Sequence, residues 1–395
     1  MRKLSIFSGS VLLISILACG GDDEAEGDDA PPPAPELAGD AVIPAPEAQP
    51  FAGGTLTATT CDLGGQRFTG ESSMSRLKSI AAAGDHVYVA DGEGVVYRFS
   101  RGDGGCTLEL DSSFGDGGSM TFERKIEWLS AAGDRVFASN GISSTYVLDG
   151  GKLAYTCEAT GYGEIDASGS WAIVPWVNST VELAELGATS CTKSEWALKN
   201  LSSDDKREGV FDSVNASVVV DGKIYIGRSI AKTVDPDNTR TIAVFNRSGK
   251  ELRRFGGGGD ISSDTRFGWI HALNPCAPGI CALDGNFRRL TAWSDDGSLA
   301  AAVDLKKLLG LKYPWINDFA VGDDGSAWFI AANDRKEGKL ADGFIFMVDG
   351  LAKAGARRGS AAPAHAEAPA DATPSGSPKQ RFGLPGKKGK GKRTR

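Results

Sequence analysis

The sequence predicts an all-β fold, a six-bladed β-propeller with four-stranded blades. Short apolar runs alternate with Gly- and Asp-rich turns at the spacing of about 8–12 residues that is typical of antiparallel β-structure. Residues 81–92 (AAAGDHVYVADG) and 130–141 (SAAGDRVFASNG) are identical at six of twelve positions. The same pattern recurs along the chain with four strands to a copy, which favours a propeller. A β-sandwich is the alternative architecture.

Six copies of this pattern predict the blades. Each has a small-residue strand, a Gly-Asp or similar turn, a strongly β strand and a further strand. The copies span residues 79–100, 128–151, 164–186, 217–250, 269–298 and 317–350. The last copy ends after its third strand, and we expect residues 55–61 (TLTATTC) to supply the fourth. That pairing would close the ring and remove exposed strand edges.

The N-terminus has the layout of a secretory signal peptide. Arg2 and Lys3 precede a largely apolar run, residues 4–18, that is short for a bilayer span. The segment 16–19 (ILAC) resembles the lipobox of bacterial lipoproteins. This resemblance implies a signal peptide over residues 1–18, a lipidated Cys19 bearing palmitate-type chains, and sorting to the outer membrane, on its periplasmic face or at the cell surface. An ordinary signal peptide with an incidental cysteine is the alternative.

The propeller is predicted over residues 51–352, and the segments on either side of it are predicted to be disordered. Residues 20–50 hold nine acidic residues, seven prolines and no basic residue, so we expect 19–50 to be a tether. Residues 353–395 form a low-complexity tail in which 379–395 carry eight Lys and Arg. This tail would attract anionic polymers or lipid headgroups, or it is a solvated tail without a specific partner. A third reading makes the tail the functional part and the propeller its display platform. No nucleic-acid partner is expected for an exported protein.

The cysteine count predicts disulfides. Apart from Cys19, the chain has six cysteines, and an even number in an exported protein favours disulfides over metal ligands. Cys276 and Cys281 flank a Pro-Gly turn and are the best single pair. The remaining four, which are Cys61, Cys106, Cys157 and Cys191, allow three connectivities. Sequential pairing would tie neighbouring repeats together.

Residues 249–289 resemble NHL repeats. Gly249-Lys250, Phe255-Gly256 and residues 284–288 (DGNFR) occupy the positions that these repeats prefer, and 110–118 (LDSSFGDGG) is similar to another bacterial blade-like repeat. The resemblance implies a propeller scaffold that serves mostly in binding protein, carbohydrate or RNA. A minority of related six-bladed propellers are metal-dependent hydrolases.

The first strand of each copy would line the central channel. Aligning the copies on their turns places one set of residues at equivalent positions: Lys78, Glu127, Gly163, Asn215 and Asp318, with His271 nearby. This set resembles the ligands of six-bladed calcium- or zinc-dependent lactonases, so Glu127, Asn215 and Asp318 are candidate ligands for Ca²⁺. The alternative is a polar, water-filled funnel without a cofactor.

Aromatic residues precede or follow these channel positions. They are Trp128, Tyr162, Phe211, Phe267, Trp269 and Trp315. Such a group would suit stacking on sugar rings or docking of an apolar side chain, and otherwise the rings wedge between blades as core. Together with the channel residues, they make this face the candidate binding surface.

Sequence signatures of other enzyme classes are absent. There is no G-x-S-x-G elbow and no phosphate-binding P-loop, and three histidines exclude a His-rich zinc site. No catalytic residue is assigned. The sequence therefore predicts a lipid-anchored envelope propeller that acts as a binding or assembly module for protein or carbohydrate ligands, with a metal-dependent hydrolase or lactonase as the alternative.

Overall fold

The protein is described from a computed structural model. The structure describes residues 45–70, 77–102, 106–141, 143–158, 171–176, 180–198, 212–230, 240–312, 314–322, 324–333 and 341–351. All described strands lie in one compact unit that begins at Ala45. The predictions for the signal peptide, for Cys19, for residues 19–44 of the tether and for the basic tail fall outside these residues. In the described part of the chain, no helix has both the length and the apolar character needed to cross a membrane.

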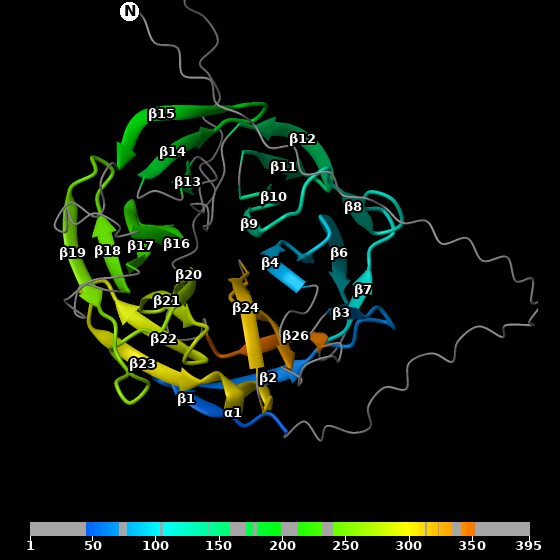
Figure 1. Cartoon of the computed structure of the whole chain (residues 1–395). Coiled ribbons are helices and arrows are strands. Elements are labelled where there is room, and N and C mark those ends of the chain that lie inside the picture. The colour runs from blue at the N-terminus through cyan, green and yellow to red at the C-terminus, as the bar shows by residue number, and fades with distance from the viewer. Residues whose placement is uncertain are drawn as a thin grey trace, which may run out of the picture. The chain divides into compact units, whose positions relative to one another are not determined.

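Antiparallel sheets are arranged around a central axis, and one edge strand of each sheet lies nearest to this axis (Figure 1). Two of them hold the sites discussed below. The first comprises β20 (Ile270–Cys276), β21 (Gly279–Asp284), β22 (Arg289–Ser294) and β23 (Leu299–Asp304). The second comprises β24 (Pro314–Val321), β25 (Ala327–Asn333), β26 (Ala341–Asp349), β2 (Gly54–Thr60) and β1 (Gln49–Phe51), with β3 (Phe68–Gly70) beside β26.

Three further sheets have at least four strands. The first holds β4 (Leu77–Ala83), β5 (His86–Asp91), β6 (Val95–Arg101) and β7 (Leu108–Leu110), with β8 (Ser119–Thr121) beside β6. The second holds β9 (Trp128–Ala132), β10 (Arg135–Ser139), β11 (Thr145–Asp149) and β12 (Lys152–Cys157). The third holds β16 (Asp212–Val220), β17 (Lys223–Ile230), β18 (Thr241–Phe245) and β19 (Glu251–Gly256).

The predicted all-β propeller with four-stranded blades is confirmed, but the number of complete blades is not. Five sheets have four or more strands, where the sequence predicted six such blades. The remaining sheet has three described strands, β13 (Trp171–Trp176), β14 (Thr180–Leu186) and β15 (Cys191–Leu198). The first strand predicted for this copy begins at residue 164, outside the described residues.

The N-terminal strand closes the ring, as predicted. β2 pairs antiparallel with β26, with Thr57 opposite Asp349 and Thr60 opposite Phe346. The chain then passes to the next sheet, where Asp62 accepts a backbone hydrogen bond from Leu108 and donates one to Cys106, both at 2.8 Å. Residues from the two ends of the domain therefore share one sheet, and the closing strand also contacts the first blade.

The predicted disulfide Cys276–Cys281 is present, and the other four cysteines, whose connectivity the sequence left open, are paired sequentially. Cys61–Cys106 joins the segment after β2 to the segment before β7, and Cys157–Cys191 joins β12 to β15, with Cα–Cα distances of 4.5 and 5.7 Å. Cys276–Cys281, at a Cα–Cα distance of 5.5 Å, closes the turn of the β20–β21 hairpin. Cys61–Cys106 and Cys157–Cys191 therefore cross-link the rim of the ring.

The pattern repeated at residues 81–92 and 130–141 forms part of the scaffold. Gly84 and Gly133 have positive φ values of 55° and 58° at the first turn of their blades, a conformation that glycine adopts without steric cost. Val87 and Val136, on the strands that follow, are completely buried. The sequence repeats because each blade needs the same turn and the same buried strand.

The only helix among the described residues connects two sheets. It is α1 (Leu305–Leu309), between β23 and β24. The Asp304 side chain accepts a hydrogen bond from the Lys306 N–H, and Gly310 ends the helix in the left-handed conformation. Its Leu305, Leu308 and Leu309 are buried, so the helix extends the apolar core of these two sheets.

Candidate functional site

Four of the innermost strands have an irregularity at one level. The strand pairing shifts around a single residue in each, namely Lys78 in β4, Asn215 in β16, His271 in β20 and Asn317 in β24. Bulges of this kind redirect side chains. Asn317, not Asp318, therefore corresponds to Lys78. The sequence alignment of the last copy is out by one residue because five residues separate the paired positions Val321 and Ala327, whereas two separate Ala83 and His86.

Asp318 faces the neighbouring blade and is completely buried. Its carboxylate accepts hydrogen bonds from Ser79 Oγ at 2.5 Å, from the Ile80 N–H at 3.1 Å and from the N–H of the next residue, Phe319. Burial raises the pKa of Asp318 to about 7, although these hydrogen bonds act to lower it. Ser79 Oγ in turn accepts from the Leu129 N–H at 2.8 Å. This chain of contacts joins β24, β4 and β9, so Asp318 connects blades.

Three of the predicted binding residues do come together. Trp269 directly precedes β20, His271 is the second residue of β20 and Trp315 is the second residue of β24. The imidazole centroid lies 6.4 Å from the ring centroids of both tryptophans, with edge-to-face geometry. Trp269 is 37% exposed, while His271 and Trp315 are half-buried. We call these three residues the platform.

Asp284 fixes the position of Trp269. As the last residue of β21, it accepts hydrogen bonds from the N–H groups of Gly268 at 2.6 Å, Trp269 at 3.1 Å and Phe287 at 2.9 Å. Asp91 plays the corresponding local part at the end of β5, where it accepts from the Glu93 N–H. The Asp284 carboxylate differs in that it also accepts hydrogen bonds from the segment that leads into the platform, at Gly268 and Trp269.

The next residue makes room for the histidine. A Cβ on Gly285 would lie 2.3 Å from the His271 ring, so only glycine fits there without displacing the imidazole. His271 Nδ1 lies 3.3 Å from the Trp269 carbonyl oxygen. Burial lowers the pKa of His271, which keeps the imidazole neutral at pH 7.

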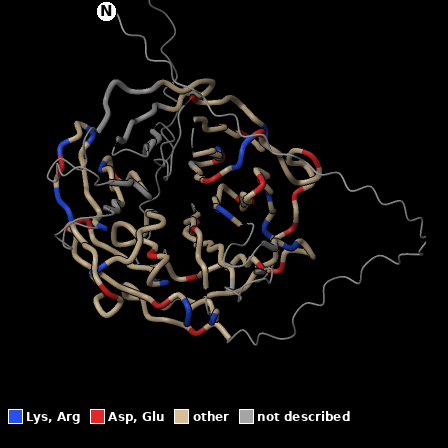
Figure 2. Tube along the Cα trace, viewed as in Figure 1, with Lys and Arg blue, Asp and Glu red and all other residues tan. Residues whose placement is uncertain are grey.

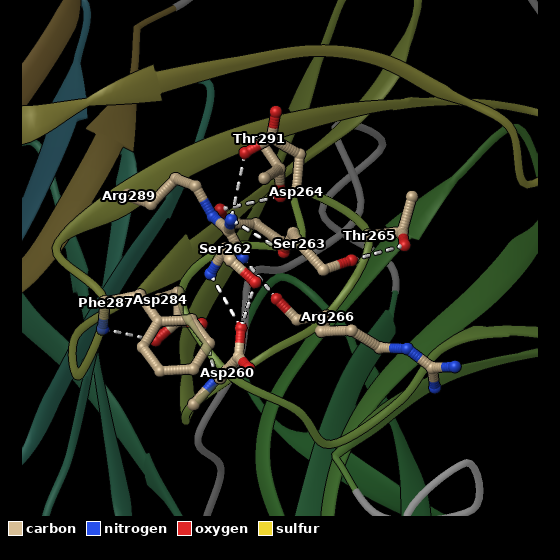
Figure 3. A network of polar contacts seen from close by, with 12 residues as sticks. Asp260, Ser262, Ser263, Asp264, Thr265, Arg266, Asp284, Phe287, Arg289 and Thr291 are labelled. Carbon is tan, nitrogen blue, oxygen red and sulfur yellow. Dashed lines mark hydrogen bonds and ion pairs between the residues drawn. The ribbon is translucent and has the colours of Figure 1, made fainter.

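Two arginines complete the support of the platform. Arg288 Nε donates to the carbonyl oxygen of Pro314, the residue before Trp315, at 2.9 Å. Arg289, only 5% exposed, donates to the Ser263 carbonyl oxygen at 2.9 Å and to Asp264 Oδ1 at 3.1 Å, and also to the Arg266 carbonyl oxygen. Figure 3 shows this guanidinium inside the loop that runs from β19 to Trp269.

The turn 284–289 (DGNFRR) therefore builds the platform. Asp284 holds the backbone of Trp269, Gly285 admits His271, Arg288 holds the residue before Trp315, and Arg289 anchors the preceding loop. Sequence reasoning used most of these residues only as evidence for the repeat family. The signal that it passed over is the clustering of two arginines and an aspartate in one hairpin turn.

The other predicted residues are placed as follows. Lys78 and Glu127 are half-buried, while Trp128 and Phe267 are buried within apolar clusters, Trp128 in the same cluster as Ile316 and Phe319. Tyr162, Gly163 and Phe211 lie outside the described residues, and for Asn215 only the backbone is described. Trp128 and Phe267 thus have the core role that was the alternative for the aromatic residues. No group of three or more His, Cys, Asp or Glu that could hold a metal ion occurs among the described residues.

Comparisons with known proteins give similarity of fold. No protein-family model matches the sequence, and no curated protein matches it significantly. Among solved structures, the WD40 propeller domain of Doa1 has a TM-score of 0.42 at 15% identity and covers 71% of this chain and 95% of its own. BamB from Moraxella catarrhalis has a TM-score of 0.38 at 11% identity, with coverages of 76% and 93%. These similarities do not identify a ligand or a partner.

Proposed function

We propose that this protein is an exported, lipid-anchored propeller that binds its ligand at the platform. In this proposal the ring has six blades, and the copy at 164–186 completes the sheet of β13, β14 and β15. The observation that carries the binding function is the construction of the platform. One hairpin turn, from Asp284 to Arg289, holds the backbone on both sides of the aromatic cluster.

Preorganisation is the physical reason to connect this construction with binding. Ordering a rotamer-rich side chain on association costs about 0.5–1.5 kcal/mol, and a site that is already ordered avoids that cost. Trp269 is partly exposed although Asp284 and Arg289 secure its backbone and the preceding loop. Structural cores do not require an exposed tryptophan fixed in this way, whereas recognition sites do.

The disulfides support export. All six cysteines of residues 51–352 are paired in the structure, and stable disulfides form in oxidising compartments such as the periplasm or cell surface. The lipobox-like segment 16–19 supports the anchor on sequence grounds. Fractionation of cells tests this part of the proposal. Wild-type protein should remain with the membranes and incorporate labelled palmitate, and Cys19→Ser should do neither.

Site-specific photo-crosslinking tests the binding part. A photoreactive side chain at Asn286, an exposed residue whose amide lies 3.4 Å from the Gly268 carbonyl oxygen, would sit beside an intact platform. We expect a light-dependent adduct in cells that falls at least tenfold with Trp269→Ala. Ile261→Ala is the matched control, because Ile261 is a 64% exposed apolar residue on the loop that precedes the platform. An adduct of equal yield in both variants would contradict the proposal.

Metal analysis separates this function from the hydrolase alternative. The full chain purified without chelators should contain no stoichiometric divalent cation. Stoichiometric Ca²⁺ or Zn²⁺ that is lost with Glu127→Ala would instead support a metal-dependent hydrolase.

A further inference from the structure

We infer that the ligand of the platform is a saccharide, with one pyranose ring stacked on Trp269. This inference rests on the proposed function and specifies the chemical class of its ligand.

The aromatic geometry leaves one indole available. His271 and Trp315 meet edge-to-face, with an interplanar angle of 89°, and both are half-buried. Trp269 is the exposed member. An aromatic ring presents a π face that attracts the weakly positive C–H groups of a partner. The C–H face of a pyranose matches a single exposed indole in size, whereas an apolar helix or strand requires a wider groove.

The polar groups beside Trp269 suit hydroxyl partners. Because a carbonyl oxygen can only accept, His271 Nδ1 carries the proton toward Trp269, and Nε2 is left as an acceptor. The hydrogen bonds of His271 and Arg288 to described residues involve only Nδ1 of the imidazole and Nε of the guanidinium, so Nε2 of His271 and the two terminal nitrogens of Arg288 make no hydrogen bond to a described residue. Asn286 adds an exposed amide. Sugar hydroxyls both donate and accept, so they can satisfy the imidazole, the guanidinium and the amide together.

The charge distribution argues against a cationic peptide. Asp284 is the carboxylate of the supporting turn, and it already accepts three backbone N–H groups and is completely buried. An aromatic cage for an ammonium group would need free negative charge near the rings. The half-buried Arg288 instead places a cation next to the residue before Trp315. Basic and acidic residues are interspersed along the chain trace around the ring (Figure 2).

A glycan array followed by titration tests the inference. The full chain, purified in detergent, is applied to an array of neutral and uronic-acid pyranose oligosaccharides, and the strongest binder is then titrated by calorimetry. We expect saturable binding that weakens at least tenfold with Trp269→Ala and stays within about twofold of wild type with Ile261→Ala. Trp269→Tyr, which keeps an aromatic face, should restore binding to within about fivefold. Preference for uronic acids would assign Arg288 to the sugar carboxylate, and preference for neutral sugars would assign it to hydroxyls.

The saccharide inference and the proposed function fail differently. Absence of binding across the array, or binding that Trp269→Ala leaves unchanged, overturns the saccharide. If the photoreactive group at Asn286 then forms a Trp269-dependent adduct with a protein, the platform is a protein-binding site and the proposed function stands. If no Trp269-dependent adduct forms either, both are overturned.

Discussion

The carboxylate of Asp284 accepts a hydrogen bond from the backbone N–H of Trp269 at 3.1 Å. Asp284 ends β21, and Trp269 directly precedes β20 of the same blade, so the second strand of this blade fixes the residue before the first. The same carboxylate caps the turn that follows it, through the Phe287 N–H at 2.9 Å. A contact needed by the scaffold thereby also orients the most exposed ring of the platform.

Gly285→Ala should displace His271 without unfolding the blade. The added Cβ would lie 2.3 Å from the imidazole, and overpacking of this kind costs about 1–3 kcal/mol. We expect the side-chain resonances of His271 and the indole N–H resonances of Trp269 and Trp315 to shift in NMR spectra. Gly54→Ala is the control, because its Cβ would meet only carbonyl oxygens at 3.7 and 3.9 Å. Unchanged resonances in Gly285→Ala would contradict the packing described.

Arg289→Lys should loosen the loop before the platform. A lysine cannot reproduce the fork that donates to Ser263, Asp264 and Arg266 together. Hydrogen exchange at the amides of residues 263–267 should accelerate several-fold. Arg254→Lys, at a surface pair with Glu251, should leave those amides unchanged. Equal exchange in the two variants would show that Arg289 does not anchor the loop.

Asp318 should make stability depend on pH. Its folded-state pKa of about 7 lies above the ordinary value of 3.8, so between these values the folded protein holds a proton that the unfolded chain has released. The contribution of Asp318 to the free energy of unfolding therefore falls as pH rises through this range, by at most about 1.4 kcal/mol per pH unit, and is constant above it.

Denaturant unfolding at pH 5 and pH 8 measures this effect. The free energy of unfolding should fall less between pH 5 and pH 8 in Asp318→Asn than in the wild type. Asp324→Asn, at a partly exposed pair with Arg101, is the control and should not remove the difference. The account of Asp318 as a buried, protonated connector fails if Asp318→Asn and the wild type show the same pH dependence.

The Cys61–Cys106 disulfide at the rim should stabilise the ring more than the Cys276–Cys281 disulfide in the hairpin. Cys61–Cys106 spans 45 positions of sequence and Cys276–Cys281 spans five. On the loop-entropy model, removing the first costs about 4 kcal/mol and removing the second about 2 kcal/mol. Chemical unfolding of the two double Cys→Ser variants checks this order, and the reverse order would contradict a closing role for Cys61–Cys106.

Much of the fold could be predicted from the sequence because each blade repeats the same local requirements. The turns at Gly84 and Gly133, the closing strand and the Cys276–Cys281 pair follow from turn chemistry and from the missing fourth strand. The position of Asp318 could not be predicted, since the turn after β24 is longer than the turn after β4, on which the copies were aligned. Burial of Trp128 likewise depends on Ile316 and Phe319, which are distant in sequence.

The platform was predicted in part. Trp269, His271 and Trp315 stood out as aromatic or ionisable residues near strand starts, but their support did not. Asp284 and Arg289 face each other at the start of the β21–β22 hairpin, and their contacts reach back to residues 263–269. Residues 284–289 were interpreted only as part of a repeat, so their second role in supporting the platform was not predicted.

The most direct test of the central claim, that the 284–289 turn builds a binding site, is the yield of the photo-crosslinked adduct at Asn286 in the Gly285→Ala background. We predict a several-fold loss of adduct relative to wild type, matching the direction of Trp269→Ala, and no loss with Gly54→Ala. An adduct that forms equally well in all four proteins would show that the platform, however firmly it is held, is not where the ligand binds.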